Sequence, residues 1–233
     1  MLGPVDYLLW IAGLVLQVYV VVCLVKQKSF LRYIPLNLYM IAATLVTVLG
    51  NATWHRYGFT SIEYRYFYYY SESLLIILLY FTIMDFYQHL FREMGLSHLI
   101  RAGAAILLVA TAFFSYGVVH QNKDHLTGRF AVELGQNLNF VGLVLTYLLW
   151  GAVVKLREAR TRLVQLVLAL GVYFSATAGV YALRNLFPSL QFSVLRWVAP
   201  FFGVWLPLAW AYTFTKVSED ARLMPAEMAV KAQ

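Results

Sequence analysis

The chain has 233 residues, of which 61% are hydrophobic and only 12% are charged. A soluble domain of this size carries roughly a quarter charged residues, so the composition excludes an ordinary water-soluble globular protein. The net charge of +7 does not indicate nucleic-acid binding, because the basic residues lie in short segments between apolar runs, as topology signals do. The mean hydropathy of +0.68 predicts instead a single-domain integral membrane protein embedded in a lipid bilayer.

Seven apolar runs are each long enough to cross a bilayer, which needs roughly 20 residues. The first opens with MLGPVDYLLW, which lacks a basic leader and a cleavage site, so we expect a retained helix rather than a signal peptide. Strands are excluded because the runs are long and show no period-2 alternation. We predict an all-α, polytopic seven-transmembrane helix bundle over residues 1–216, packed in sequence order, and a short tail over 217–233. In chain order, the predicted helices are about 4–26, 34–54, 66–91, 99–119, 131–154, 163–185 and 193–215.

The lysine and arginine residues predict the orientation, since cytoplasmic loops carry the excess of these residues. One side of the predicted bundle holds Arg56, Arg65, Lys123, Arg129, Arg184 and Arg196. The other side holds twice as many: Lys26, Lys28, Arg32, Arg92, Arg101, Lys155, Arg157, Arg160, Arg162, Lys216, Arg222 and Lys231. We therefore expect the N-terminus outside and the C-terminus in the cytoplasm.

Small residues and prolines describe helix packing. Gly171, Ser175 and Gly179 recur every four residues and predict a face that a neighbouring helix backbone can approach closely. Pro200 and Pro207 predict bends in the last helix.

Polar residues recur at the predicted outer ends of the helices. The segment YRYFYYYSESLLIILLY places Glu72 one turn after a group of tyrosines, and Tyr173, Thr177, Tyr181 and Arg184 form a stripe on one helix face. The candidate ligand-binding residues are Gln17, His55, Tyr68, Tyr69, Glu72, Glu133, Gln136, Asn137, Tyr181, Arg184 and Arg196.

The charged members of this set constrain the packing. An ionisable side chain in hydrocarbon costs about 2.5 to 3.5 kcal/mol on the insertion scale, so we expect Glu72 and Glu133 to face the interior and meet Arg184 and Arg196. Two interpretations stay open: a closed structural network of ion pairs, or a water-accessible pocket that binds a small polar ligand.

The sequence also indicates what to exclude. Retinal would need a lysine in the middle of the last helix, where only Lys216 at its end is available. Haem would need paired histidines in suitable places, and the histidines lie at helix ends. Cys23 is the single cysteine, and no zinc spacing or hydrolase motif occurs. We therefore expect no cofactor, no metal site, no catalytic residues and no enzymatic activity.

A seven-helix bundle with an outer polar pocket and a short tail is similar in layout to the membrane sensor regions of bacterial two-component kinases. That resemblance implies a multi-pass protein of the bacterial inner membrane that binds a small polar ligand and signals through a separate membrane or cytoplasmic protein. Two alternatives are a transporter of a small solute and a structural subunit of a larger membrane complex.

Overall fold

A computed structural model describes residues 4–27, 29–91, 97–120, 126–156, 161–187, 195–218 and 221. These ranges hold helices and no strand, which confirms the all-α prediction for the described part of the chain. The helices are α1 (Pro4–Lys26), α2 (Ile34–Tyr57), α3 (Ile62–Phe91), α4 (Ser97–His120), α5 (Leu126–Leu156), α6 (Thr161–Leu186) and α7 (Leu195–Lys216). Some begin earlier than predicted, α5 at residue 126 rather than 131, because a hydropathy window omits polar first turns.

Six of these helices, α1 to α6, are long and apolar enough to cross a membrane. Mean hydropathy in their most apolar windows runs from 1.2 to 2.6, while at most 44% of any window is buried inside the protein. Apolar side chains that remain exposed on long helices are typical of a surface that faces lipid. The chain thus has the character of a helical, multi-pass membrane protein.

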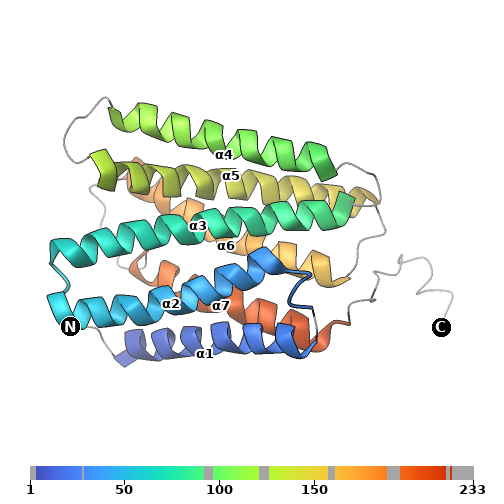
Figure 1. Cartoon of the computed structure of the whole chain (residues 1–233), viewed down its shortest axis with the longest axis horizontal. Coiled ribbons are helices and arrows are strands. Elements are labelled where there is room, and N and C mark those ends of the chain that lie inside the picture. Colours follow the sequence, from blue (N-terminus) through green and yellow to red (C-terminus); the bar gives the residue numbers. More distant parts are fainter. Residues whose placement is uncertain are drawn as a thin grey trace.

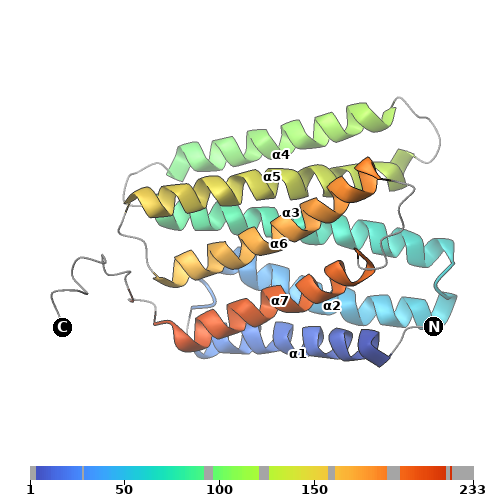
Figure 2. The same cartoon turned by 180° about the vertical axis from the view of Figure 1, so that it is seen from behind.

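The helices form a ring with one helix outside it. Going round, α1 packs on α2, α2 on α3, α3 on α5, α5 on α6 and α6 on α7, and α7 closes the ring against α1. Figure 1 shows α4 at the edge of the bundle, where it packs on α5 and more weakly on α3. Figure 2, the view from behind, shows α6 and α7 on the face of the bundle that is turned away in Figure 1. Each helix therefore contacts its neighbours in sequence, as predicted, but α3 also packs directly on α5, which leaves α4 outside the ring.

The side chains of α4 explain its position. Residues of one face, among them Thr111 and Ser115, are buried, whereas Phe113 is 72% exposed and Ile106 is 69% exposed. Such a helix buries one narrow stripe and leaves the rest of its apolar surface for lipid, so it covers the bundle instead of completing it.

Because successive helices alternate in direction, the starts of α1, α3, α5 and α7 share one end of the bundle with the ends of α2, α4 and α6 (Figure 1). We call this the Glu72 end, after the carboxylate nearest to it on α3. The opposite end, where α6 begins and α7 finishes, is called the Arg162 end.

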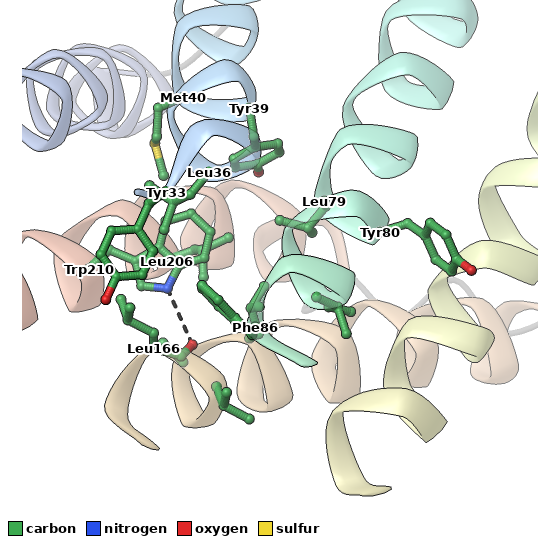
Figure 3. Close-up of a cluster of buried hydrophobic side chains, with 14 of the residues drawn as sticks. Tyr33, Leu36, Tyr39, Met40, Leu79, Tyr80, Phe86, Leu166, Leu206 and Trp210 are labelled. Atoms are coloured by element: carbon green, nitrogen blue, oxygen red, sulfur yellow. Dashed lines mark hydrogen bonds between the residues drawn. The ribbon is translucent and has the colours of Figure 1, made fainter. Parts of the chain in front are cut away.

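The core lies inside the ring, nearer the Arg162 end. Figure 3 shows Leu36 and Met40 of α2, Leu79 of α3 and Trp210 of α7 gathered there, each at most 1% exposed. The indole Nε1 of Trp210 donates to the Leu166 carbonyl of α6 at 3.4 Å, which ties α7 to α6.

A tight contact between α5 and α6 occurs at Gly142, a residue the sequence did not single out. A Cβ on Gly142 would lie 2.6 Å from the ring of Phe174, so only glycine fits there. Of the predicted small face, a Cβ on Gly171 would lie 3.3 Å from Thr146, and Ser175 Oγ lies 3.2 Å from the Tyr147 hydroxyl. Gly179 has open space around it, so the predicted close approach does not extend that far. Pro200 and Pro207 lie within α7, and a bend there stays a prediction.

Candidate functional site

Glu72 lies in the wall of the ring, where α3 faces α6. It follows the first residue of α3 by ten positions, which is about 15 Å along a helix axis. The hydroxyl of Tyr181 on α6 donates a hydrogen bond to Glu72 Oε1 at 2.8 Å. A carboxylate and a tyrosine 109 residues apart in sequence are thus direct partners across the bundle.

The two residues border a cavity of about 190 Å³ to which five helices contribute, α2, α3, α5, α6 and α7. Its apolar wall includes Leu75, Ile76, Val180 and Val198. The other polar side chains that line it are Tyr39, Tyr68, Asn139, Tyr173, Thr177 and Arg184. Convergent polar groups on an otherwise apolar wall are typical of small-molecule sites.

Hydroxyl and amide groups around the cavity are connected to one another. The Glu72 carboxylate interacts electrostatically with the hydroxyls of Tyr68 and Tyr173. Thr177 Oγ1 donates to Asn139 Oδ1 at 2.9 Å, while Asn139 Nδ2 donates to the Gly135 carbonyl at 2.8 Å. These bonds fix the orientation of Asn139 and leave the carboxylate as the strongest acceptor facing the cavity. A carboxylate accepts about four hydrogen bonds, so the tyrosines leave acceptor capacity for a further donor.

Arg184 lines the same cavity without pairing with Glu72. Its side chain is exposed, and no carboxylate of the described residues lies within 4.0 Å of its guanidinium. The expected ion pair between Glu72 and Arg184 is therefore replaced by the hydrogen bond from Tyr181. The reason is position: Arg184 is three residues nearer the end of α6 than Tyr181, at the rim of the cavity.

A second cavity, of about 450 Å³, adjoins the first and shares Tyr68 with it. It lies among α1, α2, α3 and α7 and has aromatic walls that include Trp10, Trp54 and Phe67. Gln17 lines it, and the buried Oε1 of Gln17 has no hydrogen-bond donor in the described structure. Gln17 thus belongs to this neighbouring cavity and not to the Glu72 cavity.

Four predicted site residues lie away from the Glu72 cavity. Glu133 and Gln136 are half-buried on α5 and do not line it. Asn137 points toward α4, where its Nδ2 donates to Ser115 Oγ at 2.9 Å. His55 is exposed at the end of α2 and stacks on Trp54, with 4.8 Å between ring centroids.

The remaining two have different outcomes. Tyr69 is half-buried beside the cavity, with its ring 5.7 Å from that of Tyr68. The side chain of Arg196 lies outside the described residues, so its predicted role stays a prediction.

Sequence reasoning missed Tyr39 and Asn139. Asn139 follows the predicted Gln136 by three positions, a spacing that could have drawn attention to it. Tyr39 carries no comparable signal, because it lies inside an apolar run and is only 9% exposed.

The described residues contain no group of three or more histidine, cysteine and acidic side chains that could hold a metal ion. His89, near the end of α3, lies 3.5 Å from the Asp85 carboxylate and stacks on Tyr33. His120, the last residue of α4, stacks on Tyr116.

No protein-family model, characterised protein or solved structure matches the chain. The geometry of the Glu72 cavity is therefore the basis on which its function is proposed.

Proposed function

We propose that this protein is a receptor-like, seven-span membrane protein that binds a small polar ligand in the Glu72 cavity and signals through a separate protein. The observation that carries the proposal is the cavity itself. Glu72 and Tyr181 face a space of about 190 Å³ among five helices, with further hydroxyl and amide groups around it. A purely structural carboxylate would be enclosed by its partners, whereas this one borders open space.

The charge distribution supports an orientation with the Glu72 end outside. The sequence assigns twelve lysine and arginine residues to the segments on the side where α1 and α7 end and six to the opposite side, and the richer side is cytoplasmic under the positive-inside rule. All seven helices then cross the bacterial inner membrane, and the ligand enters from outside the cytoplasm.

The packing between the Glu72 cavity and the Arg162 end supports ligand binding over solute transport. Leu79 lines the cavity, and the next residues on the same face of α3 are Ile83 and Phe86, each fully buried. Tyr33 packs edge-on against Phe86 at 6.4 Å and against Phe214 at 5.7 Å. This layer of aromatic and aliphatic side chains lies between the cavity and the Arg162 end. A receptor needs no path through this layer, whereas a transporter would have to open one.

Helix α6 provides a route for a signal. Tyr181 and Arg162 stand 19 positions apart on it, about 28 Å along the axis. At its far end, Arg162 holds α1 and α7 through hydrogen bonds to Gln27 and the Val217 carbonyl. A ligand that shifts α6 at the cavity would therefore also shift the contacts among α1, α6 and α7 at the cytoplasmic side.

The binding proposal is tested with purified protein in detergent. Thermal unfolding is measured with and without a library of small polar molecules, for the native chain and for Glu72→Gln. We expect at least one compound to raise the melting temperature of the native chain and to lose this effect in Glu72→Gln. Glu133→Gln is the matched control, because it removes a carboxylate from the same end that does not line the cavity. Ligand uptake into liposomes by the native chain would select transport instead.

The orientation is tested by cysteine labelling in intact cells, after Cys23→Ser. Thr60→Cys lies between α2 and α3 and Leu31→Cys between α1 and α2, both exposed. We expect a membrane-impermeant maleimide to label position 60 and to reach position 31 only after lysis. The reverse pattern would invert the topology. Labelling of both positions from the same side would show that α2 does not cross the membrane.

A further inference from the structure

The Glu72 cavity is bordered by two opposite charges that do not neutralise each other. Glu72 contributes the carboxylate from α3, and Arg184 contributes the guanidinium from α6. Within the described chain, Arg184 has no carboxylate within 4.0 Å, and Glu72 takes its hydrogen bond from Tyr181. Because the cavity separates the two groups and no ion pair joins them, both remain available to a ligand.

The two charges sit at different depths. Tyr181 reaches Glu72 inside the wall of the ring, while Arg184 is exposed and lies nearer the end of α6. A cationic group that enters first passes the rim and meets the carboxylate, with the oxygens of Tyr68 and Tyr173 nearby. An anionic group attached to it then stays at the rim, beside the guanidinium.

The remaining wall and the volume limit the size of such a ligand. Drug-sized ligands occupy pockets of roughly 300–1,000 Å³, whereas this cavity has about 190 Å³. Leu75, Ile76, Val180 and Val198 offer a short aliphatic group a surface to pack on. A molecule of single charge would satisfy one of the two groups and leave the other without a partner.

Building on the proposed binding function, we propose that the ligand is a small zwitterion: an ammonium that meets Glu72, and an acidic group that meets Arg184, on a compact aliphatic body. Free aliphatic amino acids present this pair of charges, and so does the ethanolamine headgroup of a phospholipid. The shared chemistry defines the ligand class, and the arms of the experiment separate the two sources.

The experiment measures thermal unfolding and equilibrium binding of the full chain in a detergent without charged headgroups. The probes are glycine, L-alanine, L-valine and L-leucine, together with the single-charge counterparts of valine, isobutylamine and 3-methylbutanoate. Phosphoethanolamine represents the lipid headgroup. We expect one zwitterion to bind at least tenfold more tightly than either its amine or its acid counterpart.

Two variants locate the charges. Glu72→Gln should weaken binding of the zwitterion and of the amine at least tenfold and leave binding of the acid unchanged. Arg184→Gln should weaken binding of the zwitterion and of the acid at least tenfold and leave binding of the amine unchanged. Arg184 is exposed and without a carboxylate partner, so Arg184→Gln keeps the inference testable even if Glu72→Gln fails to fold. Glu133→Gln and Arg65→Gln are the matched controls, since neither residue lines the cavity, and both should bind like the native chain.

The outcomes separate this inference from the function on which it rests. Tight binding of an amino acid supports it with a free solute as the source, and binding of phosphoethanolamine alone supports it with a lipid headgroup. An amine or an acid that binds as tightly as the zwitterion overturns the inference and leaves a ligand-binding receptor standing. If no probe of any charge shifts the native chain, the zwitterion is excluded, and failure of the wider polar library would remove the binding function as well.

Discussion

The two ends of the bundle use similar polar groups in opposite ways. At the Arg162 end, Arg162 is 4% exposed, and its guanidinium donates to the Val217 carbonyl at 3.0 and 2.7 Å and to Gln27 Oε1 at 3.1 Å. It also lies over the ring of Phe214 at 5.4 Å, and the amide of Gln27 donates to the Phe214 carbonyl. At the Glu72 end, the carboxylate borders a cavity, and Arg184 is exposed.

The difference lies in where each charged group finds its partners. Arg162 finds its acceptors within the protein, on the residues that directly follow α1 and α7, so its charge is used to join helices. Glu72 keeps acceptor capacity directed at open space, so part of its interaction energy is left for another molecule. A buried charge therefore marks a binding site only when its partners are incomplete.

Removal of the guanidinium should produce the largest effect on stability. Hydrogen bonds that involve a charged group contribute about 1.5–3 kcal/mol each, so we expect Arg162→Ala to lower the free energy of unfolding by about 3 kcal/mol. Arg162→Lys should recover part of this loss, because an ammonium cannot reproduce the planar set of donors. The measurement is unfolding in detergent followed by circular dichroism.

The control for that prediction comes from the other end. Arg184→Ala removes an exposed guanidinium that has no carboxylate within 4.0 Å among the described residues, and such substitutions change stability by less than about 0.5 kcal/mol. Equal losses in Arg162→Ala and Arg184→Ala would erase the distinction between a closed and an open end.

An intermediate effect is expected where Glu72 meets Tyr181. Tyr181→Phe removes the hydroxyl that donates to Glu72 Oε1 at 2.8 Å, which should lower stability by about 1.5 kcal/mol. A double-mutant cycle with Glu72→Gln should show coupling of at least about 0.5 kcal/mol. The same cycle between Glu72→Gln and Arg184→Gln should be additive within error. Coupling to Arg184 instead would mean that an ion pair, and not the tyrosine, holds the carboxylate.

The smallest effect on stability is expected for two hydrogen bonds made by opposite faces of α5. Ser115→Ala removes the acceptor of Asn137, and Thr177→Val removes the donor to Asn139. Hydrogen bonds across membrane helices average about 0.6 kcal/mol, so both variants should lower the melting temperature slightly and to a similar extent. Only Thr177→Val should alter ligand binding, because Thr177 and Asn139 line the cavity. A ligand effect of Ser115→Ala would show that the binding site extends to α4.

Much of the candidate site follows from local spacing. On α6, Tyr173, Thr177, Tyr181 and Arg184 lie on one helix face because of the 3.6-residue repeat, and all four line the cavity. Glu72 could be predicted as an inward residue because a carboxylate is unfavourable toward lipid. The rest could not be predicted, since polar residues on α5 are found on more than one face. Asn137 and Asn139 are two residues apart, so they point to nearly opposite sides, one at α4 and the other at the cavity.

The sequence by itself determined which segments are helices, because helix length and apolar content are local properties that the bilayer thickness constrains. It also determined that Glu72 and Tyr181 are inward-facing candidates. Only the tertiary structure decided that α4 lies outside the ring, that Asn139 and not Asn137 borders the cavity, and that Arg162 is enclosed while Arg184 is not. These outcomes depend on the rotation of each helix about its axis and on which neighbour it meets. Residues far apart in the chain set both, such as Gln27 and Val217 around Arg162.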